Sequence, residues 1–223
     1  MLKVLPFFLL FLGIAGFVFA STSGAYADGE TQALTGKHRL LVPQLSSDRV
    51  QQPPTPTPEP EPYQGAVKSI YLASAGLWGT NIVEERDTEP YLDRERLEEP
   101  TSPDRIAWYS RFGRPGYRAG NTMFAAHVDY VRYGPAAFWG LSGATIGDYL
   151  YLTMDNGLVY TYSVQSVRVI HVDDIDMNEV VYPPLSSDRE RVTLISCGGT
   201  FIPFPGGGGE YLSRVVLIAD RYH

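Results

Sequence analysis

The sequence has a single cysteine, Cys197, among 223 residues. One cysteine excludes an intramolecular disulfide and any zinc site built from paired thiolates. Histidines are also few, and no two are spaced His-x-x-x-His, a spacing that would favour a metal site. The four histidines are His38, His127, His171 and His223. We therefore expect the protein to use no metal and no other cofactor.

Clusters of basic residues are absent too. The chain carries 18 Lys and Arg against 25 Asp and Glu, a net charge of −7, and neither sign gathers in one stretch. Nucleic-acid binding needs a basic patch or stripe, so this class of function has no electrostatic support. The dispersed acidity indicates solubility rather than a charged partner.

The N-terminus combines one positive charge with a long apolar run. Lys3 precedes residues 4–20, which are apolar and uncharged. A membrane-spanning helix needs about 17–25 such residues, so this run is at the lower limit. Residues 25–27, Ala-Tyr-Ala, also fit the small-x-small pattern of a signal cleavage site. Residues 1–27 are therefore a membrane anchor or a cleaved signal peptide, and either predicts export of the remainder.

Residues 28–64 are predicted to be a disordered spacer. Within them, residues 53–62 alternate proline with polar residues. Such a run cannot pair in a sheet or bury a core, and it favours extended polyproline II. We expect a semi-rigid stalk.

Residues 65–223 predict one β-rich domain. Asn156-Gly157 between two β-rich runs is a strong hairpin signal. Only two short helices are expected, near 135–141 and 173–180. The pattern favours an all-β barrel or sandwich. The expected strands are 67–72, 122–126, 148–154, 158–170, 191–196 and 214–219.

Cys197 is the first candidate for catalysis. On a strand, Thr193, Ile195 and Cys197 share one face. Gly198-Gly199 is expected to end this strand, which would leave the thiol at its tip. A lone cysteine is otherwise a small buried hydrophobe, and that reading stays open.

A cysteine nucleophile needs a base or a cation to form the thiolate. His127 follows the predicted strand 122–126 and is the preferred base, with His171 at the end of strand 158–170 as its rival. Arg214 begins strand 214–219 and could stabilise an oxyanion. Two plainer readings remain: His127 is satisfied by local hydrogen bonds, or Arg214 pairs with Glu210 on the surface.

The order of these motifs resembles the sortases. A histidine is followed by Thr-Leu-Ile-Ser-Cys at 193–197, and then by an arginine before an apolar strand. The resemblance covers residues 65–223 and is most similar to the class E and class F sortases. The sequence departs from the family at Ser196, where many sortases have Thr, and in its glycine-rich segment 206–209. Further matching stretches are 106–109, 114–116, Asn121, 127–129, 138–139 and 147–148.

The resemblance implies a closed eight-stranded β-barrel with short helices, and a site of His127, Cys197 and Arg214 at one rim. It implies a cysteine transpeptidase that cleaves an LPXTG-like sorting signal through a thioester. The implied partners are surface proteins with a C-terminal sorting signal and an amine of the cell wall or a pilin. Two alternatives stay open: a secreted cysteine peptidase that hydrolyses, and a non-catalytic cell-surface binding module.

We predict that residues 1–27 hold the protein at the outer face of the cell membrane, because Lys3 favours an N-terminus that stays inside. Cell fractionation with detection of the domain should place it in the membrane fraction. Recovery in the culture medium, with a new N-terminus at Asp28, would instead show a cleaved signal peptide.

Overall fold

The computed structural model describes residues 61–91, 94–205 and 207–222. The predicted anchor at 1–27 lies outside these residues, and so does the spacer up to residue 60. Every described residue belongs to one compact unit, Thr57–His223. None of the helices in this described part is long and apolar enough to cross a membrane.

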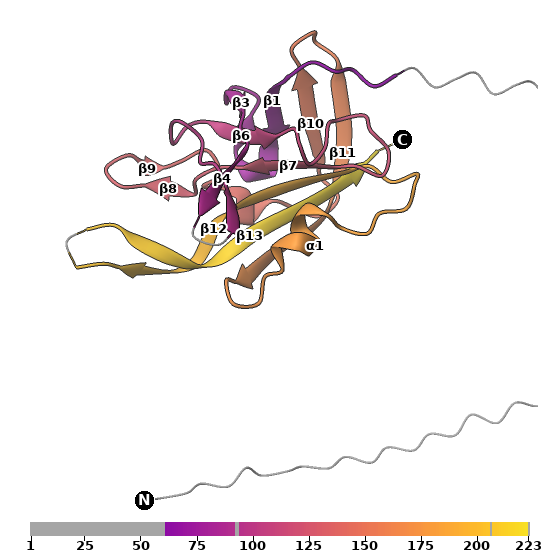
Figure 1. The fold of residues 1–223 in the computed structure, drawn as a ribbon. Helices are drawn as coiled ribbons and strands as arrows, with labels where there is room; N and C mark the ends of the chain where they lie inside the picture. The colour runs from indigo at the N-terminus through magenta and orange to yellow at the C-terminus, as the bar shows by residue number, and fades with distance from the viewer. Residues whose placement is uncertain (1–60, 92–93, 206, 223) are drawn as a thin grey trace, which may run out of the picture. The chain divides into compact units, whose positions relative to one another are not determined.

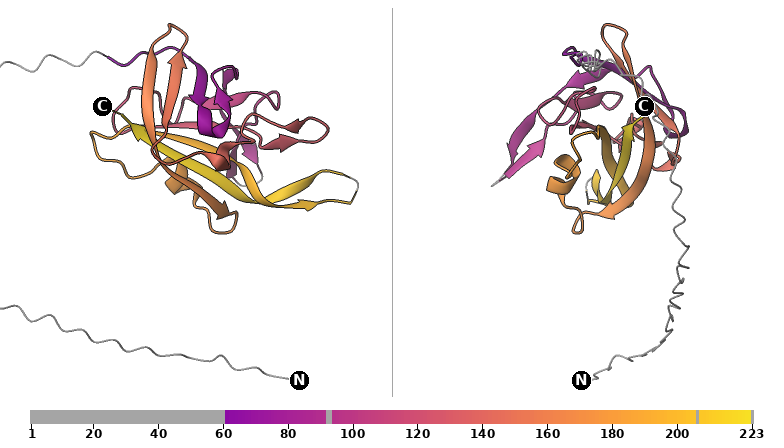
Figure 2. Two further views of the ribbon diagram at one scale, coloured as in Figure 1. Left: turned by 180° about the vertical axis from the view of Figure 1, so that it is seen from behind. Right: turned by 90° about the vertical axis from the view of Figure 1, so that its right-hand side faces the viewer.

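The described residues form a nearly all-β fold around one strongly curved sheet of nine strands (Figures 1 and 2). The strand order is β2-β1-β10-β11-β13-β12-β7-β6-β3, and two hairpins, β4-β5 and β8-β9, stand outside it. The strands are β1 (Val67–Leu72), β2 (Leu77–Trp78), β3 (Val83–Glu85), β4 (Thr88–Tyr91), β5 (Arg94–Leu97), β6 (Ile106–Tyr109), β7 (Asn121–Ala125), β8 (Asp129–Tyr130), β9 (Gly134–Pro135), β10 (Tyr149–Met154), β11 (Val159–His171), β12 (Arg191–Pro203) and β13 (Gly209–Arg221).

The sheet is not the closed eight-stranded barrel that we predicted. Its order has two ends, β2 and β3, and these strands do not pair with each other in the described part of the chain. After the 3-10 helix η1 (Ala73–Ala75), β2 folds back onto β1 and pairs with it at Tyr71↔Trp78. It thereby occupies the edge of β1 that closure would require.

Several predicted elements are confirmed. The bounds of β1 agree residue for residue with the prediction, and the Asn156-Gly157 turn joins β10 to β11. Gly157 adopts a φ of 88°, which glycine reaches without strain. The Asn156 side chain accepts a hydrogen bond from the Leu158 amide at 2.9 Å.

The predicted helix at 135–141 was wrong, because this segment is a series of turns before the 3-10 helix η2 (Leu141–Gly143). Gly140 shows why the turns pack as they do. A Cβ at this position would lie 2.4 Å from the carbonyl oxygen of Ala75, so only glycine permits the approach.

Two apolar clusters lie on opposite faces of β12. Val192 and Leu194 belong to the larger cluster on the concave side, whereas Ile195 belongs to a smaller one that includes Val181. Val181 ends the helix α1 (Met177–Val181), which falls within the predicted region 173–180 except for its last residue. Because β12 is covered on both faces, its residues 192–196 are all buried.

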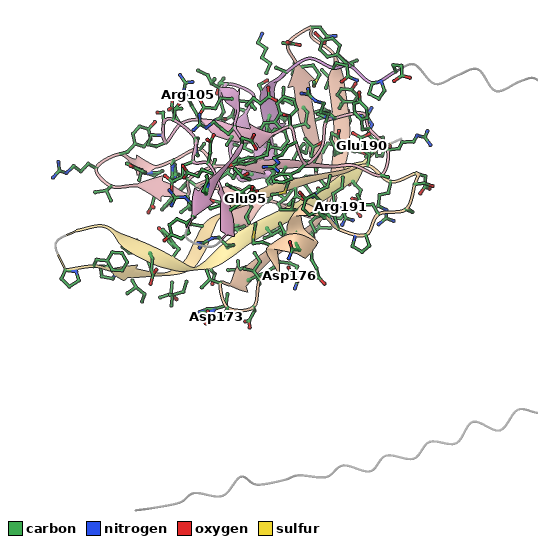
Figure 3. The ribbon with its side chains drawn as sticks, in the orientation of Figure 1. Glu95, Arg105, Asp173, Asp176, Glu190 and Arg191 are labelled. Atoms are coloured by element: carbon green, nitrogen blue, oxygen red, sulfur yellow. The ribbon has the colours of Figure 1, made fainter. Side chains whose placement is uncertain are left out.

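Asn121 fastens α1 to the sheet. Its amide nitrogen donates to the carbonyl oxygens of Val180 at 2.9 Å and Val181 at 3.0 Å. Its amide oxygen accepts from the Thr193 hydroxyl at 2.8 Å. At the other end of α1, Asp176 is the N-cap and accepts from the Asn178 amide at 2.8 Å (Figure 3).

We predict that Asn121→Ala lowers the free energy of unfolding by about 2–3 kcal/mol, because it leaves buried polar groups without partners. Chemical denaturation followed by tryptophan fluorescence measures the change. Asn178→Ala is the matched control, since Asn178 is exposed. Equal stability of the two variants would show that Asn121 does not hold the helix.

Candidate functional site

Cys197 lies within a long strand and not at a strand tip, which corrects the prediction. β12 continues to Pro203, and its pairing with β13 shifts between Gly198↔Ser213 and Phe201↔Tyr211. This shift places one extra residue in β12, which is a β-bulge. Gly199 makes it possible with a φ of 75°, and a Cβ there would lie 2.6 Å from the Ser213 hydroxyl oxygen.

Arg214 lies directly opposite Cys197 in the β12–β13 ladder. The prediction placed it at the start of a strand, but β13 begins five residues earlier, at Gly209. At the far end of the ladder, Arg191, which is labelled in Figure 3, is the cross-strand partner of Asp220. Their side chains form two hydrogen bonds of 2.8 and 3.2 Å. This bidentate pair stabilises the register that brings Cys197 opposite Arg214.

His127 reaches Cys197 from the other side of β12. β7 and β12 are parallel, and their last paired residues are Ala125 and Ile195. The register continues one step further, because the Ser196 hydroxyl donates to the Ala126 carbonyl oxygen at 2.9 Å. The next residues along the two segments are His127 and Cys197.

The side chains of Cys197 and Arg214 point to the α1 side of the sheet. Side chains alternate along a strand, so Cys197 shares its face with Ile195, and Arg214 shares its face with Val216. Ile195 and Val216 both belong to the smaller cluster beneath α1. The site therefore lies on the outer face of the curved sheet. The prediction had placed it at the rim of a barrel.

Two pockets meet at His127, Cys197 and Arg214, and these three residues line both of them. The hairpin pocket, of about 640 Å³, lies between β8 and the β12–β13 hairpin. These two hairpins project from the same side of the domain (Figure 1). The other residues that line the hairpin pocket are Val128, Asp129, Tyr130, Val131, Val172, Phe201, Gly208, Gly209, Glu210, Tyr211 and Leu212.

The helix pocket, of about 470 Å³, lies on the α1 side of the same three residues. One wall is the segment around the β4–β5 hairpin, to which Glu95 belongs (Figure 3), and the opposite wall is α1. Its apolar lining side chains come from β5, β6, β7, α1 and β12 and from the segments next to them. They include Leu97, Tyr109, Phe112, Ala125, Met177, Val181 and Ile195.

The surroundings of Cys197 act on its thiol in opposite directions. Burial raises its pKa, the Arg214 guanidinium lowers it, and the carboxylates of Glu99 and Asp129 raise it. Glu99 also lies near the imidazole, with its Oε2 4.0 Å from His127 Nε2. The Arg214 guanidinium is thus the group that favours the thiolate.

His171, the rival histidine, lines neither pocket. Its ring belongs to a local turn, where Nδ1 accepts from the Asp173 amide at 3.3 Å. The reading of Arg214 as a partner of Glu210 is not supported within the described residues. Arg214 Nη1 donates to the carbonyl oxygens of Tyr211 at 3.1 Å and Ser213 at 3.0 Å.

Sequence reasoning missed several residues that shape the site. Tyr211 lies just after the glycine-rich segment 206–209, and its hydroxyl donates to Asp129 Oδ2 at 2.6 Å. Glu99 follows the β4–β5 hairpin, whose short strands carry no alternating pattern. Asn121 was noted only as part of the family resemblance. Its position directly before an apolar strand was the one signal that could have suggested a structural role.

Residues 79–222 match the family model for the sortase domain. The chain belongs to the sortase family. The match includes all three candidate residues and both hairpins. A comparison with curated proteins gave no match.

Solved sortase structures are similar to this chain. A Clostridium perfringens sortase D5 transpeptidase is 16% identical, covers 71% of this chain and 79% of its own, and has a TM-score of 0.47. Sortase C1 of Streptococcus agalactiae, in complex with MTSET, is 20% identical over 54% of each chain, with a TM-score of 0.41. Sortase A from Corynebacterium diphtheriae is 17% identical over 59% of this chain and 57% of its own, with a TM-score of 0.42.

The chain therefore spans a little over half the length of the sortase C1 and sortase A structures. Membership of the family rests on the family model. The predicted likeness to classes E and F stays a prediction.

We predict that Arg214→Ala moves the pKa of Cys197 further up, because the nearby positive charge is lost. The rate of alkylation by iodoacetamide, measured against pH, should reach its midpoint at a higher pH than in the parent protein. Arg214→Lys keeps the charge, so its midpoint should move less. Cys197 is the one thiol in the chain, so the signal comes from a single site.

The control for this experiment is Arg168→Ala, because Arg168 is exposed on β11 and lines neither pocket. An alkylation midpoint that stays at the parental pH in Arg214→Ala would show that the guanidinium does not act on the thiol.

Proposed function

We propose that this protein is a cysteine transpeptidase that cleaves an LPXTG-like sorting signal and transfers the cleaved protein to an amine of the cell envelope. The observation that supports this most is the meeting of two pockets at Cys197. Transfer needs room for an acyl donor and for an acceptor on different sides of one nucleophile. An endopeptidase also holds residues on both sides of the scissile bond, so the products formed with an amine present decide between transfer and hydrolysis.

The chemistry of the pockets favours one assignment of the substrates. The helix pocket has apolar side chains, which suit the Leu and Pro of a sorting signal, and it also has the carboxylates of Glu95, Glu98 and Glu99. The hairpin pocket contains the carboxylates of Asp129 and Glu210 beside the guanidinium of Arg214. Carboxylates, which attract an ammonium group, line both pockets, so the apolar side chains decide: we assign the helix pocket to the sorting signal and the hairpin pocket, on the other side of Cys197, to the amine acceptor.

In the first half of the proposed reaction, His127 takes the thiol proton and Cys197 Sγ attacks the carbonyl carbon of Thr in the Thr–Gly bond of the signal. The C–N bond breaks, and His127 donates a proton to the leaving amine. In the second half, the acceptor amine attacks the thioester carbon, His127 takes its proton, and the C–S bond breaks. This is covalent catalysis in two steps.

Arg214 is the proposed oxyanion donor. One of its nitrogens, Nη1, is held by the carbonyl oxygens of Tyr211 and Ser213. A guanidinium has five N–H groups, so donors remain for the substrate. Holding one nitrogen on the backbone limits the motion of the others, which places them for the transition state.

The site would work outside the cell. The proposed location is the extracellular face of the cell membrane, with residues 1–27 as a single-pass anchor and the proline-rich spacer as a stalk. The alternative is secretion after cleavage of a signal peptide. The partners that we propose are surface proteins with a C-terminal sorting signal and an amine acceptor of the cell wall or a pilin.

We predict that His127→Ala lowers kcat for an LPXTG peptide by roughly 10²- to 10⁴-fold, because a general acid–base group is lost. His171→Ala should stay near the parental rate. Cys197→Ala should give no product, since the chain has no second thiol. Mass spectrometry of the products in the presence of hydroxylamine measures cleavage and transfer together.

The same experiment separates the alternatives. Hydrolysed peptide as the main product at high hydroxylamine would favour a cysteine peptidase. No turnover by the parent protein would favour a binding module. A larger loss in His171→Ala than in His127→Ala would show that the wrong histidine was assigned.

A further inference from the structure

Tyr211 makes three contacts that join separate parts of the site. Its hydroxyl donates to Asp129 Oδ2 at 2.6 Å, across 82 residues of chain. Its carbonyl oxygen accepts from Arg214 Nη1 at 3.1 Å. Its ring packs on its cross-strand partner Phe201, with 5.0 Å between the ring centroids. This packing holds the ring beyond the bulge, so the hydroxyl has a defined position.

The loop that carries His127 needs such a contact. The hydrogen bonds that join this loop to β12 are made by the backbone amide and the carbonyl oxygen of Ala126, the residue before His127. On its other side, the carbonyl oxygens of His127 and Val128 accept from the amides of Phe138 at 2.9 Å and Ala136 at 3.0 Å. These bonds fix the loop to its own hairpin and not to the strand of Arg214.

We propose that Tyr211 is a positioning residue. The hydrogen bond from its hydroxyl to Asp129 holds the His127 loop against the strand that carries Arg214. The inference rests on the proposed function, because it concerns the same three residues. Asp129 lies two residues after His127, and Tyr211 three residues before Arg214. The single hydrogen bond between them therefore fixes the separation of the acid–base group and the oxyanion donor.

The protonation of the pair agrees with this role. The hydrogen bond to Asp129 raises the pKa of Tyr211 to about 12. The hydroxyl thus keeps its proton and remains a donor throughout the neutral range. The donated proton also screens part of the negative charge of Asp129, which otherwise disfavours the Cys197 thiolate.

Tyr211→Phe tests the proposal, because it keeps the ring on Phe201 and removes only the hydroxyl. We expect kcat for the LPXTG peptide to fall roughly 10- to 100-fold, with little change in KM, since small misplacements of catalytic groups cost about this much. Tyr133→Phe is the matched control, an exposed tyrosine of the β8–β9 turn that lines neither pocket. It should keep the parental kcat.

Asp129 supplies the second arm. The amide oxygen of Asp129→Asn can still accept from Tyr211, so this variant should lose less kcat than Asp129→Ala. Combining Tyr211→Phe with Asp129→Ala should cost no more than the larger single loss, because both remove one interaction. Additive losses, or a kcat within about twofold of the parent in Tyr211→Phe, would overturn the proposal.

Hydrogen–deuterium exchange decides the question without any substrate. The Ala136 and Phe138 amides donate to the His127 loop, so they should exchange faster in Tyr211→Phe than in the parent and in Tyr133→Phe. Parental exchange in Tyr211→Phe would reject the positioning role even if the parent protein turned out to have no transpeptidase activity. Faster exchange in an inactive parent would keep the contact and reject the proposed function.

Discussion

The register of β12 with its two neighbours determines where every group of the site lies. On one side β12 runs antiparallel to β13, which places Arg214 opposite Cys197. On the other side it runs parallel to β7, which brings His127 beside the same cysteine. A slip of one residue would turn these side chains to the opposite face of the sheet. Burial on both faces of β12 makes such a slip costly, so the core itself maintains the alignment.

The two faces of the sheet have different roles: one carries most of the apolar core, and the other carries the candidate site. The concave face carries the larger apolar cluster, whereas the outer face carries α1, the smaller cluster and the site. Asn121 connects the two roles, because it holds α1 by hydrogen bonds and α1 forms a wall of the helix pocket. Loss of this one amide would therefore weaken the fold and widen the helix pocket at the same time.

The sequence predicted β1, β10 and β11 to within one residue at each end, since alternation and the Asn156-Gly157 turn are local signals, but β12 and β13 extend well beyond the predicted 191–196 and 214–219. It also identified His127, Cys197 and Arg214, which the fold brings together. It did not predict the bulge, because Gly198-Gly199 is read as an end of a strand unless the partner strand is known. The open edge of the sheet could not be foreseen for the same reason, as β2 has only two residues. Tyr211 carried no local signal at all, because its partner is 82 residues away.

The bulge at Gly199 separates two parts of one hairpin that differ in how freely they can vary. Before the bulge, the hydrogen-bonded pair Arg191–Asp220 at the far end of the ladder stabilises the register that places Cys197 opposite Arg214. Beyond the bulge, Phe201, Gly209, Glu210 and Tyr211 line the hairpin pocket and not the helix pocket. Residues could be added in equal number to both strands beyond the Phe201↔Tyr211 pair without moving Cys197. The tip of this hairpin is thus an exchangeable module, which can change in length while Tyr211, Arg214 and Cys197 keep their positions.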